Sequence, residues 1–203
     1  MDLIVTRRVL VLAAAGLCAA ACSSPNSASV PGPTTPAASS PAPAATESPP
    51  PGDIPDSTVY IAYRPASGQY EVKVPEGWAR TASPAGVSFT DKLNTIAIQT
   101  SRAAAPTMAS ARAAEVPAIR RSVHGFVLAG LSTVSRPAGT AVLIRYSADS
   151  RPDPVTGKVY KDAIERYEFY RNGTEAVVTL AGPAGADNVD PWRTVTNSFR
   201  WLR

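Results

Sequence analysis

The sequence predicts an α+β domain built on a mostly antiparallel sheet, and three patterns support this prediction. Several short segments alternate apolar and polar residues, as strands with one buried face do. Asn172-Gly173 lies between two such segments, and this dipeptide is the strongest short signal for a two-residue hairpin turn. Residues 107–122 and 190–202 instead repeat apolar residues at helical spacing. Six or seven strands with one internal and one terminal helix are therefore expected.

The first part of the domain is expected to be strands. Residues 60–63 form a short apolar patch whose type the pattern does not decide. Residues 70–74 alternate apolar and polar side chains, and Pro75-Glu76-Gly77 ends that strand. Residues 87–90 and 95–100 alternate again on either side of a short polar turn, which predicts a hairpin.

Residues 107–122 predict the internal helix. Thr107 or Ser110 is suited to cap its N-terminus, because a hydroxyl oxygen there accepts a free backbone N–H. Pro117 lies inside the pattern and is expected to kink the helix or divide it, since proline has no N–H to donate to the preceding turn.

The remaining strands are expected at 126–134 and 141–148 and, after a loop at 149–161 rich in turn formers, at 163–170 and 175–180. Asp190 is expected to cap the terminal helix, with Pro191 at its first position. One apolar stripe of this helix should pack on the sheet, namely Trp192, Val195, Phe199 and Leu202.

The chain divides into three regions. Residues 1–21 resemble an export signal, with Arg7 and Arg8 near the start and then an uncharged apolar run. That run has about 13 residues, whereas about 20 are needed to cross a bilayer. Residues 22–56 are dominated by Pro, Ala, Ser and Thr and are expected to be a disordered tether. Residues 57–203 are expected to form the globular domain.

Cys22 is the predicted modification site. It follows Ala19-Ala20-Ala21, an arrangement that resembles a bacterial lipobox. The mature protein is then expected to begin at Cys22, to carry acyl chains such as palmitate there, and to lie on the extracytoplasmic face of the cell membrane. A simple signal peptide cut after Ala21 is the alternative, and ordinary and twin-arginine export both stay open. Cys18 is lost with the signal, so no disulfide is expected.

The composition and charge of the chain limit the classes of binding partner that are expected. The formal net charge of +4 suits an anionic partner such as phospholipid headgroups or acidic wall polymers. The basic residues are scattered and are not interleaved with aromatics, so no nucleic-acid partner is expected. No phosphate loop or dinucleotide glycine pattern occurs, and no cofactor is expected. His124 is the only histidine, and it is expected to be structural.

No catalytic or metal-binding residue is predicted. Asp149, Asp153 and Asp162 surround the long loop, but their spacing does not match a calcium-binding loop. Glu165 and Glu168 are the carboxylate pair that a hydrolase would need. Residues three apart on a strand point to opposite faces, so these two are not expected to cooperate.

The strand and turn Tyr70-Glu-Val-Lys-Val-Pro-Glu-Gly-Trp78, followed by the Phe-containing strand at 87–91, resembles the opening of PsbP-like domains. The closing segment, with Asp190-Pro191-Trp192 and Ser198-Phe199, is similar too. The order of signal, lipobox, tether and one such domain resembles lipoproteins of the LpqN type from high-GC Gram-positive bacteria. The resemblance covers 69–203 and implies an antiparallel sheet sandwiched by helices, with a binding or accessory role and no shared catalytic residues.

The expected function is therefore that of a membrane-anchored cell-envelope lipoprotein that is not an enzyme. Its domain is expected to be monomeric and to bind a small apolar ligand or an envelope protein, at residues that the sequence does not identify. A scaffold that helps to assemble a membrane complex is the alternative, and an envelope hydrolase is less favoured. Ligand binding predicts a closed apolar cavity, whereas a scaffold predicts a flat exposed patch.

Overall fold

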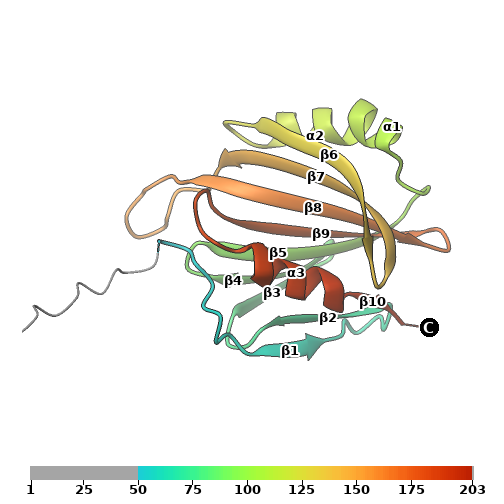
Figure 1. The fold of residues 1–203 in the computed structure, drawn as a ribbon, viewed down its shortest axis with the longest axis horizontal. Coiled ribbons are helices and arrows are strands. Elements are labelled where there is room, and N and C mark those ends of the chain that lie inside the picture. The colour runs from blue at the N-terminus through green and yellow to red at the C-terminus, as the bar shows by residue number, and fades with distance from the viewer. Residues whose placement is uncertain (1–49, 203) are drawn as a thin grey trace, which may run out of the picture. The chain divides into compact units, whose positions relative to one another are not determined.

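A seven-stranded antiparallel sheet forms the centre of the fold (Figure 1). The computed structural model describes residues 50–202, and these contain ten strands in two sheets. In spatial order the large sheet consists of β3 (Ala79–Ser83), β4 (Gly86–Asp91), β5 (Asn94–Arg102), β9 (Thr174–Pro183), β8 (Lys161–Arg171), β7 (Gly139–Asp149) and β6 (Val127–Arg136). The small sheet consists of β1 (Tyr60–Tyr63), β2 (Tyr70–Pro75) and β10 (Arg200–Trp201).

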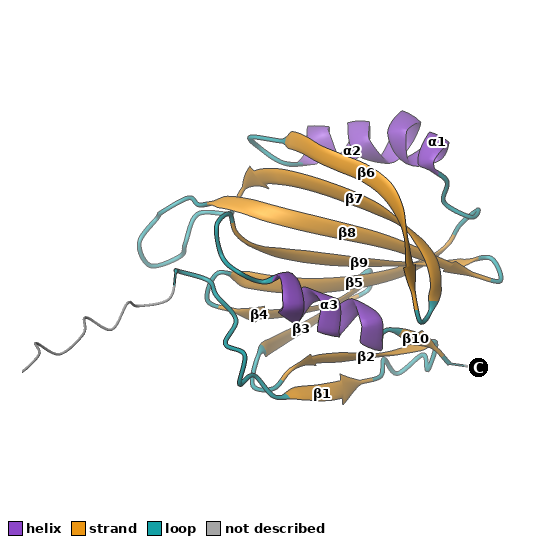
Figure 2. Ribbon diagram, in the orientation of Figure 1, coloured by secondary structure: helices purple, strands orange, loops and turns teal. Residues whose placement is uncertain are grey.

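Different elements cover the two faces of the large sheet (Figure 2). The small sheet and helix α3 (Val189–Ser198) lie on one face. A helical segment lies on the other and consists of α1 (Met108–Ser110), the π-helical segment η1 (Ala111–Glu115) and α2 (Val116–Ser122). Strand alternation supplies both cores, since Leu143 packs toward α3 and its neighbour Ile144 toward α2. The predicted α+β class is confirmed.

The strands agree with the predicted segments except for β3, and for β10, which falls in the segment predicted as the terminal helix. The turn at Asn172-Gly173 has φ values of 50° and 78°, the positive pair that a type I′ hairpin requires. β3 was not predicted, and all five of its side chains are exposed. It is a strand because it pairs with β4 along its whole length, not because one of its faces is buried.

The internal helix is capped and divided as predicted. The backbone N–H of Ser110 donates to Oγ1 of Thr107 at 3.0 Å, and the N–H of Thr107 donates to Oγ of Ser110 at 2.9 Å, which forms a capping box. The division is a five-residue π-helical segment, η1, directly before Val116 and Pro117. Proline offers no N–H to the turn before it, so a locally wider turn there loses little hydrogen bonding.

The terminal helix differs from the prediction at both ends. It starts at Val189 after Asn188, so Asp190 is its second residue and not its cap. It ends at Ser198, and Phe199 is extended with φ −61° and ψ 129°. The chain then forms β10, so Leu202 does not belong to a helical stripe. The extended backbone at Phe199 allows β10 to pair with β2.

The packed domain begins upstream of residue 57, the boundary expected from composition. The side chain of Ile54 is only 5% exposed. The backbone N–H of Ile54 donates to Oδ1 of Asn188 at 2.9 Å, and the carbonyl of Gly52 accepts from Nδ2 of Asn94 at 2.8 Å and from Nδ2 of Asn188 at 3.0 Å. These bonds fasten residues 52–54 to the start of β5 and of α3. We call this arrangement the asparagine clasp.

Candidate functional site

The face of the large sheet that carries α3 has an open groove. In Figure 1, α3 crosses this face beside β5 and β9, and strands β6, β7 and β8 extend beyond it. The groove between α3 and these three strands has a volume of about 350 Å³. Sites for small ligands have volumes of about 300–1,000 Å³. We call this cavity the α3 groove.

Strand alternation sets the floor of the α3 groove. Ala163, Glu165 and Tyr167 occupy alternate positions on β8, so their side chains lie on the same face. Arg145 on β7 is the register partner of Glu165 and brings a guanidinium to the same place. Helix α3 forms the opposite wall through Trp192, which is 8% exposed.

A chain of hydrogen bonds crosses the groove floor. Nη2 of Arg136 donates to the hydroxyl of Tyr167 at 3.2 Å, and this hydroxyl donates to Oε2 of Glu165 at 2.6 Å. The Arg136 guanidinium also lies 5.3 Å from the centre of the Tyr167 ring. Burial raises the pKa of Tyr167 to about 12, and the bond to Glu165 acts in the same direction. Tyr167 therefore stays protonated and holds the Glu165 carboxylate in place.

The charges that line the groove favour an anion. The groove is lined by three guanidinium groups and one carboxylate. The guanidinium groups belong to Arg136, Arg145 and Arg193, and the carboxylate belongs to Glu165. Arg193 is paired with Asp190 within α3. Arg145 has no ion pair with any described residue. A guanidinium free of protein partners is suited to bind a carboxylate or phosphate through two parallel hydrogen bonds.

Most of the remaining lining is apolar. Trp192 lies on the wall and Ala163 on the floor, and Pro183 and Ala186 also line the groove. Val189, the first residue of α3, is 67% exposed at the groove. A site with apolar walls and a few cationic donors binds molecules that carry both an apolar body and an anionic group. Ligand binding predicted a closed apolar cavity, whereas the groove in the structure is open and partly cationic.

The carboxylate pair considered from the sequence is not brought together. Glu165 lies in the α3 groove, whereas Glu168 lies on the opposite face, as the strand spacing predicted. Glu168 is 1% exposed, and its Oε1 accepts from Nε of Arg166 at 3.0 Å. Arg166 also binds Glu115 of η1 at 3.1 Å and so ties the helical segment to the sheet. Glu168 is therefore part of the packing under η1.

The three aspartates of the long loop line a second groove, between that loop and the β4–β5 turn. Asp149 is paired with Lys161. Asp153 accepts three hydrogen bonds from Val155 and Thr156, which lower its pKa. Burial raises the pKa of the third, Asp162, to about 6. Within residues 50–202 no three His, Cys, Asp or Glu side chains are placed to hold a metal ion.

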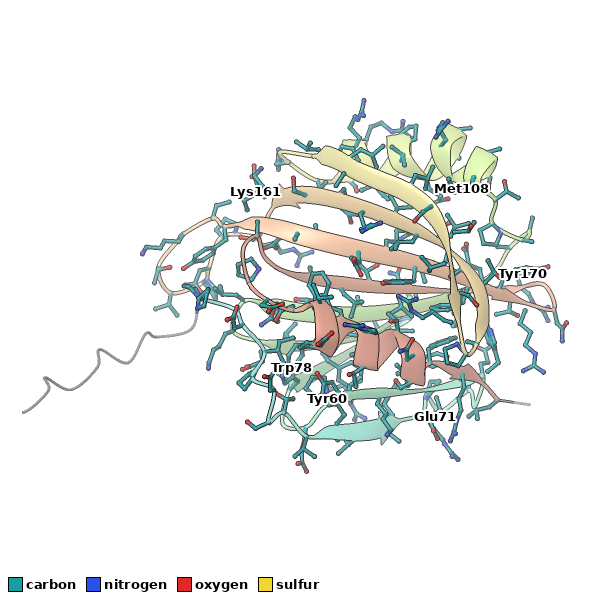
Figure 3. All side chains as sticks on the ribbon, in the orientation of Figure 1. Tyr60, Glu71, Trp78, Met108, Lys161 and Tyr170 are labelled. Carbon is teal, nitrogen blue, oxygen red and sulfur yellow. The ribbon has the colours of Figure 1, made fainter. Side chains whose placement is uncertain are left out.

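Other predicted residues have structural places or lie outside the described residues. Trp78, marked in Figure 3, is half-buried and packs against the core beside β3. His124 is exposed just after α2, and its carbonyl accepts from the N–H of Asp149 at 2.9 Å. Cys22, the predicted lipidation site, lies outside the described residues. No helix in the described part of the chain is long and apolar enough to cross a membrane.

The arginines of the α3 groove were missed by the sequence analysis. They come from β6, β7 and α3, and nothing in their spacing links them. One signal was available, because Arg145 interrupts the apolar run of β7 that includes Leu143 and Ile144. A charged residue inside such a strand needs an open place on its face, and the α3 groove provides it.

No protein-family model matches the chain, and no curated protein matches its sequence. Solved structures do resemble it. Cyanobacterial PsbP (CyanoP) from Synechocystis is 15% identical with a TM-score of 0.51, and the match covers 74% of this chain and 98% of that one. The Ran-binding protein Mog1p of Saccharomyces cerevisiae is 11% identical with a TM-score of 0.50, over 71% and 96% of the two chains.

LpqN, involved in cell envelope biogenesis of Mycobacterium tuberculosis, is 16% identical with a TM-score of 0.45, over 73% of this chain and 93% of that one. Identities this low establish a common fold and not a common activity, because one fold hosts many functions. The match to CyanoP spans nearly all of that protein. The chain therefore has a PsbP-like fold.

Proposed function

We propose that this chain is a cell-envelope lipoprotein whose domain binds a small apolar ligand carrying an anionic group in the α3 groove. The observation that supports this most strongly is the lining of the groove. Trp192 and Val189 offer apolar contact, and Arg145 offers a guanidinium without a described ion-pair partner. A ligand with both features replaces water on the apolar wall and places its charge beside the arginine.

The proposal is one of binding and not of catalysis. The α3 groove holds a single carboxylate, Glu165, which accepts a hydrogen bond from the protonated hydroxyl of Tyr167. Acid–base hydrolysis by two carboxylates needs both of them to reach the scissile bond of one bound substrate. Glu168 is on the other face of the sheet and is buried under η1.

The binding test uses decanoate and decanol, which share an alkyl chain and differ in charge. We expect decanoate to shift the indole N–H signal of Trp192 in NMR spectra and to bind about tenfold more tightly than decanol, as one charge-assisted contact allows. Arg145→Gln should remove most of that difference. Equal affinity for the two probes, or an unchanged difference in the Arg145→Gln protein, would contradict the proposal.

A second variant tests the position of the site. Val189→Trp places a large side chain at the groove mouth without disturbing the core, because Val189 is 67% exposed. It should weaken binding of both probes. Val155→Trp is the matched control, since Val155 is 91% exposed and does not line the groove. If both tryptophan variants bind decanoate like the parent protein, the ligand does not occupy the α3 groove.

The anchor is tested separately. The proposal holds that Cys22 carries the acyl chains, on the basis of the lipobox-like Ala19-Ala20-Ala21-Cys22. Metabolic labelling with an alkyne fatty acid should mark the parent protein, whereas Cys22→Ala should be unlabelled and should either leave the membrane fraction or remain as an uncleaved precursor. More than one acyl chain gives stable anchoring, and a single short chain gives only marginal binding. Equal labelling of the two proteins rules out this anchor and leaves the binding site untouched.

A further inference from the structure

The two ends of the large sheet differ in their charged residues. The last register pairs at one end contain Asp91, Asp149 and Asp162, and Lys161 is paired with Asp149 there. The last pairs at the other end contain Arg102, Arg136 and Arg171. We call these the aspartate end and the arginine end. In Figure 3, Lys161 marks the aspartate end of β8, and Tyr170 lies near its arginine end.

The arginine end contains a further groove, distinct from the α3 groove and from the groove lined by the loop aspartates. It has a volume of about 280 Å³ and lies between the Asn172-Gly173 hairpin and the loop before β2. We call it the hairpin groove. Six of the residues that line it are Arg102, Arg171, Asn172, Gln69, Trp201 and Leu202.

The two arginines of the hairpin groove are held close to one turn. Arg102 and Arg171 are both register partners of Thr174, one from each side of β9. Adjacent strands are about 4.8 Å apart, so the two backbones lie about 10 Å apart with their side chains on the same face. A Cβ atom added to Gly173 would lie 3.3 Å from Nη1 of Arg102, so this guanidinium lies over the turn.

These guanidinium groups have no counter-charge in the described chain. Neither Arg102 nor Arg171 forms an ion pair with any residue between 50 and 202. At the same end, Glu71 is already shared by Arg64 and Arg200. Two like charges beside one turn repel each other, and a bound anion replaces that repulsion by attraction.

One side-chain acceptor of the groove lining is also engaged. Oε1 of Gln69 accepts from the hydroxyl of Thr100 at 3.1 Å and of Ser67 at 3.5 Å. The charged groups that the hairpin groove offers to a ligand are the guanidiniums of Arg102 and Arg171, and the Asn172 side-chain amide adds a neutral donor. Donors with positive charge and a planar, bidentate geometry select oxyanions over neutral acceptors.

The groove also faces away from the place where the chain joins the domain. The asparagine clasp holds residues 52–54 at Asn94, which is the first residue of β5, and Arg102 is the last. β5 has nine residues, and at about 3.3 Å per residue it spans about 30 Å. The hairpin groove is thus presented at the end of the sheet opposite to the clasp.

We propose that the hairpin groove is an oxyanion-binding site that takes a phosphate or carboxylate group, independently of the α3 groove. Arg102 and Arg171 bind the anionic oxygens, and the Asn172 amide adds a donor at the turn. Envelope molecules with either group have the required chemistry, so the test compares the two oxyanions directly.

The test titrates inorganic phosphate and acetate into the protein at constant ionic strength, with chloride as the reference anion. The indole N–H signal of Trp201 is the reporter, because this group lines the groove and is buried without a described acceptor. Its resonance is assigned from the Trp201→Phe spectrum. Either oxyanion should move this signal and the Asn172 amide signals with saturation at about millimolar concentration. A larger response to phosphate than to acetate identifies the phosphate group as the preferred ligand, and the reverse identifies the carboxylate.

Matched variants decide whether the response comes from the groove. Arg102→Gln and Arg171→Gln should each weaken binding about tenfold, while Arg112→Gln, an exposed arginine on η1, should leave it unchanged. All three side chains are exposed, and a dispersed spectrum verifies that each variant is folded. The proposal is wrong if chloride moves the signals as much as phosphate and acetate do, or if the Arg102 and Arg171 variants behave like Arg112→Gln. Decanoate binding at Trp192 provides a separate readout, so a negative result at one groove does not contradict the proposal for the other groove.

Discussion

Phe199 is the residue on which the core under α3 depends most. Its side chain is fully buried, and its ring stacks at 4.8 Å on Phe169 and at 5.4 Å on Tyr70. Trp201 meets it edge-on at 5.4 Å. Phe199 therefore joins the large sheet, the small sheet and the end of α3 through a single side chain.

Phe199→Ala should lower the free energy of unfolding by about 3–5 kcal/mol, because it removes a buried ring and leaves a cavity among other aromatics. Chemical denaturation followed by far-UV circular dichroism measures the loss. Val155→Ala is the control and should change stability by less than about 0.5 kcal/mol, since that side chain is 91% exposed. A loss below about 1 kcal/mol for Phe199→Ala would show that the three elements do not share this contact.

Asp162 links stability to pH. Burial raises its pKa to about 6 from an ordinary value near 3.8. A carboxyl group whose pKa is raised by folding stabilises the protein while it is protonated in both states, below about pH 4. That contribution is lost as the pH rises through about 6, where the folded protein must ionise a buried group.

We therefore expect Asp162→Asn to flatten the decline in unfolding free energy between pH 4 and pH 7. Urea denaturation at several pH values measures the slope, and the difference between variant and parent should be about 1 kcal/mol or more across this interval. Asp91→Asn, at an exposed position of the same end of the sheet, is the control. Identical slopes for the parent protein and Asp162→Asn would contradict the assignment.

The asparagine clasp is the element that the sequence analysis missed most completely. Asn94 and Asn188 are 4% and 3% exposed, and Nδ2 of Asn188 donates to Oδ1 of Asn94 at 3.0 Å. Gly182 leaves room for them, since a Cβ there would lie 2.4 Å from Oδ1 of Asn94. Gly52 and Ile54 were assigned to the tether from composition, because the composition of a Pro/Ala/Ser-rich segment does not indicate hydrogen-bond partners that are distant in sequence.

Asn188→Ala should cost about 2–3 kcal/mol of unfolding free energy, because it leaves the N–H of Ile54 and Oδ1 of Asn94 without their buried partner. Thermal or chemical denaturation measures the cost. Asn197→Ala is a control on the same helix, and its exposed side chain should contribute little. Equal effects of the two variants would mean that the clasp is not part of the stabilising core.

Elements with a strong local signal were predicted, and those fixed by distant partners were not. The Asn172-Gly173 turn and the Thr107 cap depend on neighbouring residues, so the sequence contains the whole reason for them. The end of α3 depends on β2, which pairs with the chain after Phe199 and takes it out of the helix. The arginines of the α3 groove likewise come from three separate elements, and only the interruption of β7 by Arg145 was visible in advance.

At the scale of the whole molecule, the fold separates its two candidate sites. The α3 groove lies on a face of the large sheet, and the hairpin groove lies at its arginine end. Both are open to solvent in the same molecule, and they share no lining residue. Under the two proposals, one domain would bind an amphiphilic ligand and an oxyanion at grooves that have no lining residue in common.

Limited proteolysis tests where the domain begins. We expect the resistant fragment to start at or before Gly52. Proteases cleave segments that unfold locally, and the hydrogen bonds of the clasp keep residues 52–54 folded. Mass spectrometry of the fragment gives its first residue. In the Asn188→Ala protein that residue should move downstream, toward β1 at Tyr60. A fragment of the parent protein that begins after Ile54 would contradict the clasp.

The asparagine clasp also determines which strand first bears tension that is applied to the chain upstream of the domain. A pull on the chain upstream of Pro50 reaches Gly52 before it reaches β1, and Gly52 is bonded to Asn94 on β5 and to Asn188 at the start of α3. The force therefore passes first into β5, an interior strand with β4 on one side and β9 on the other, and not into the edge strand β1. Peeling an edge strand breaks its hydrogen bonds one after another, whereas an interior strand shares the load between two neighbours. The four-residue strand β1, which has one partner, is thereby shielded from tension on the chain before it.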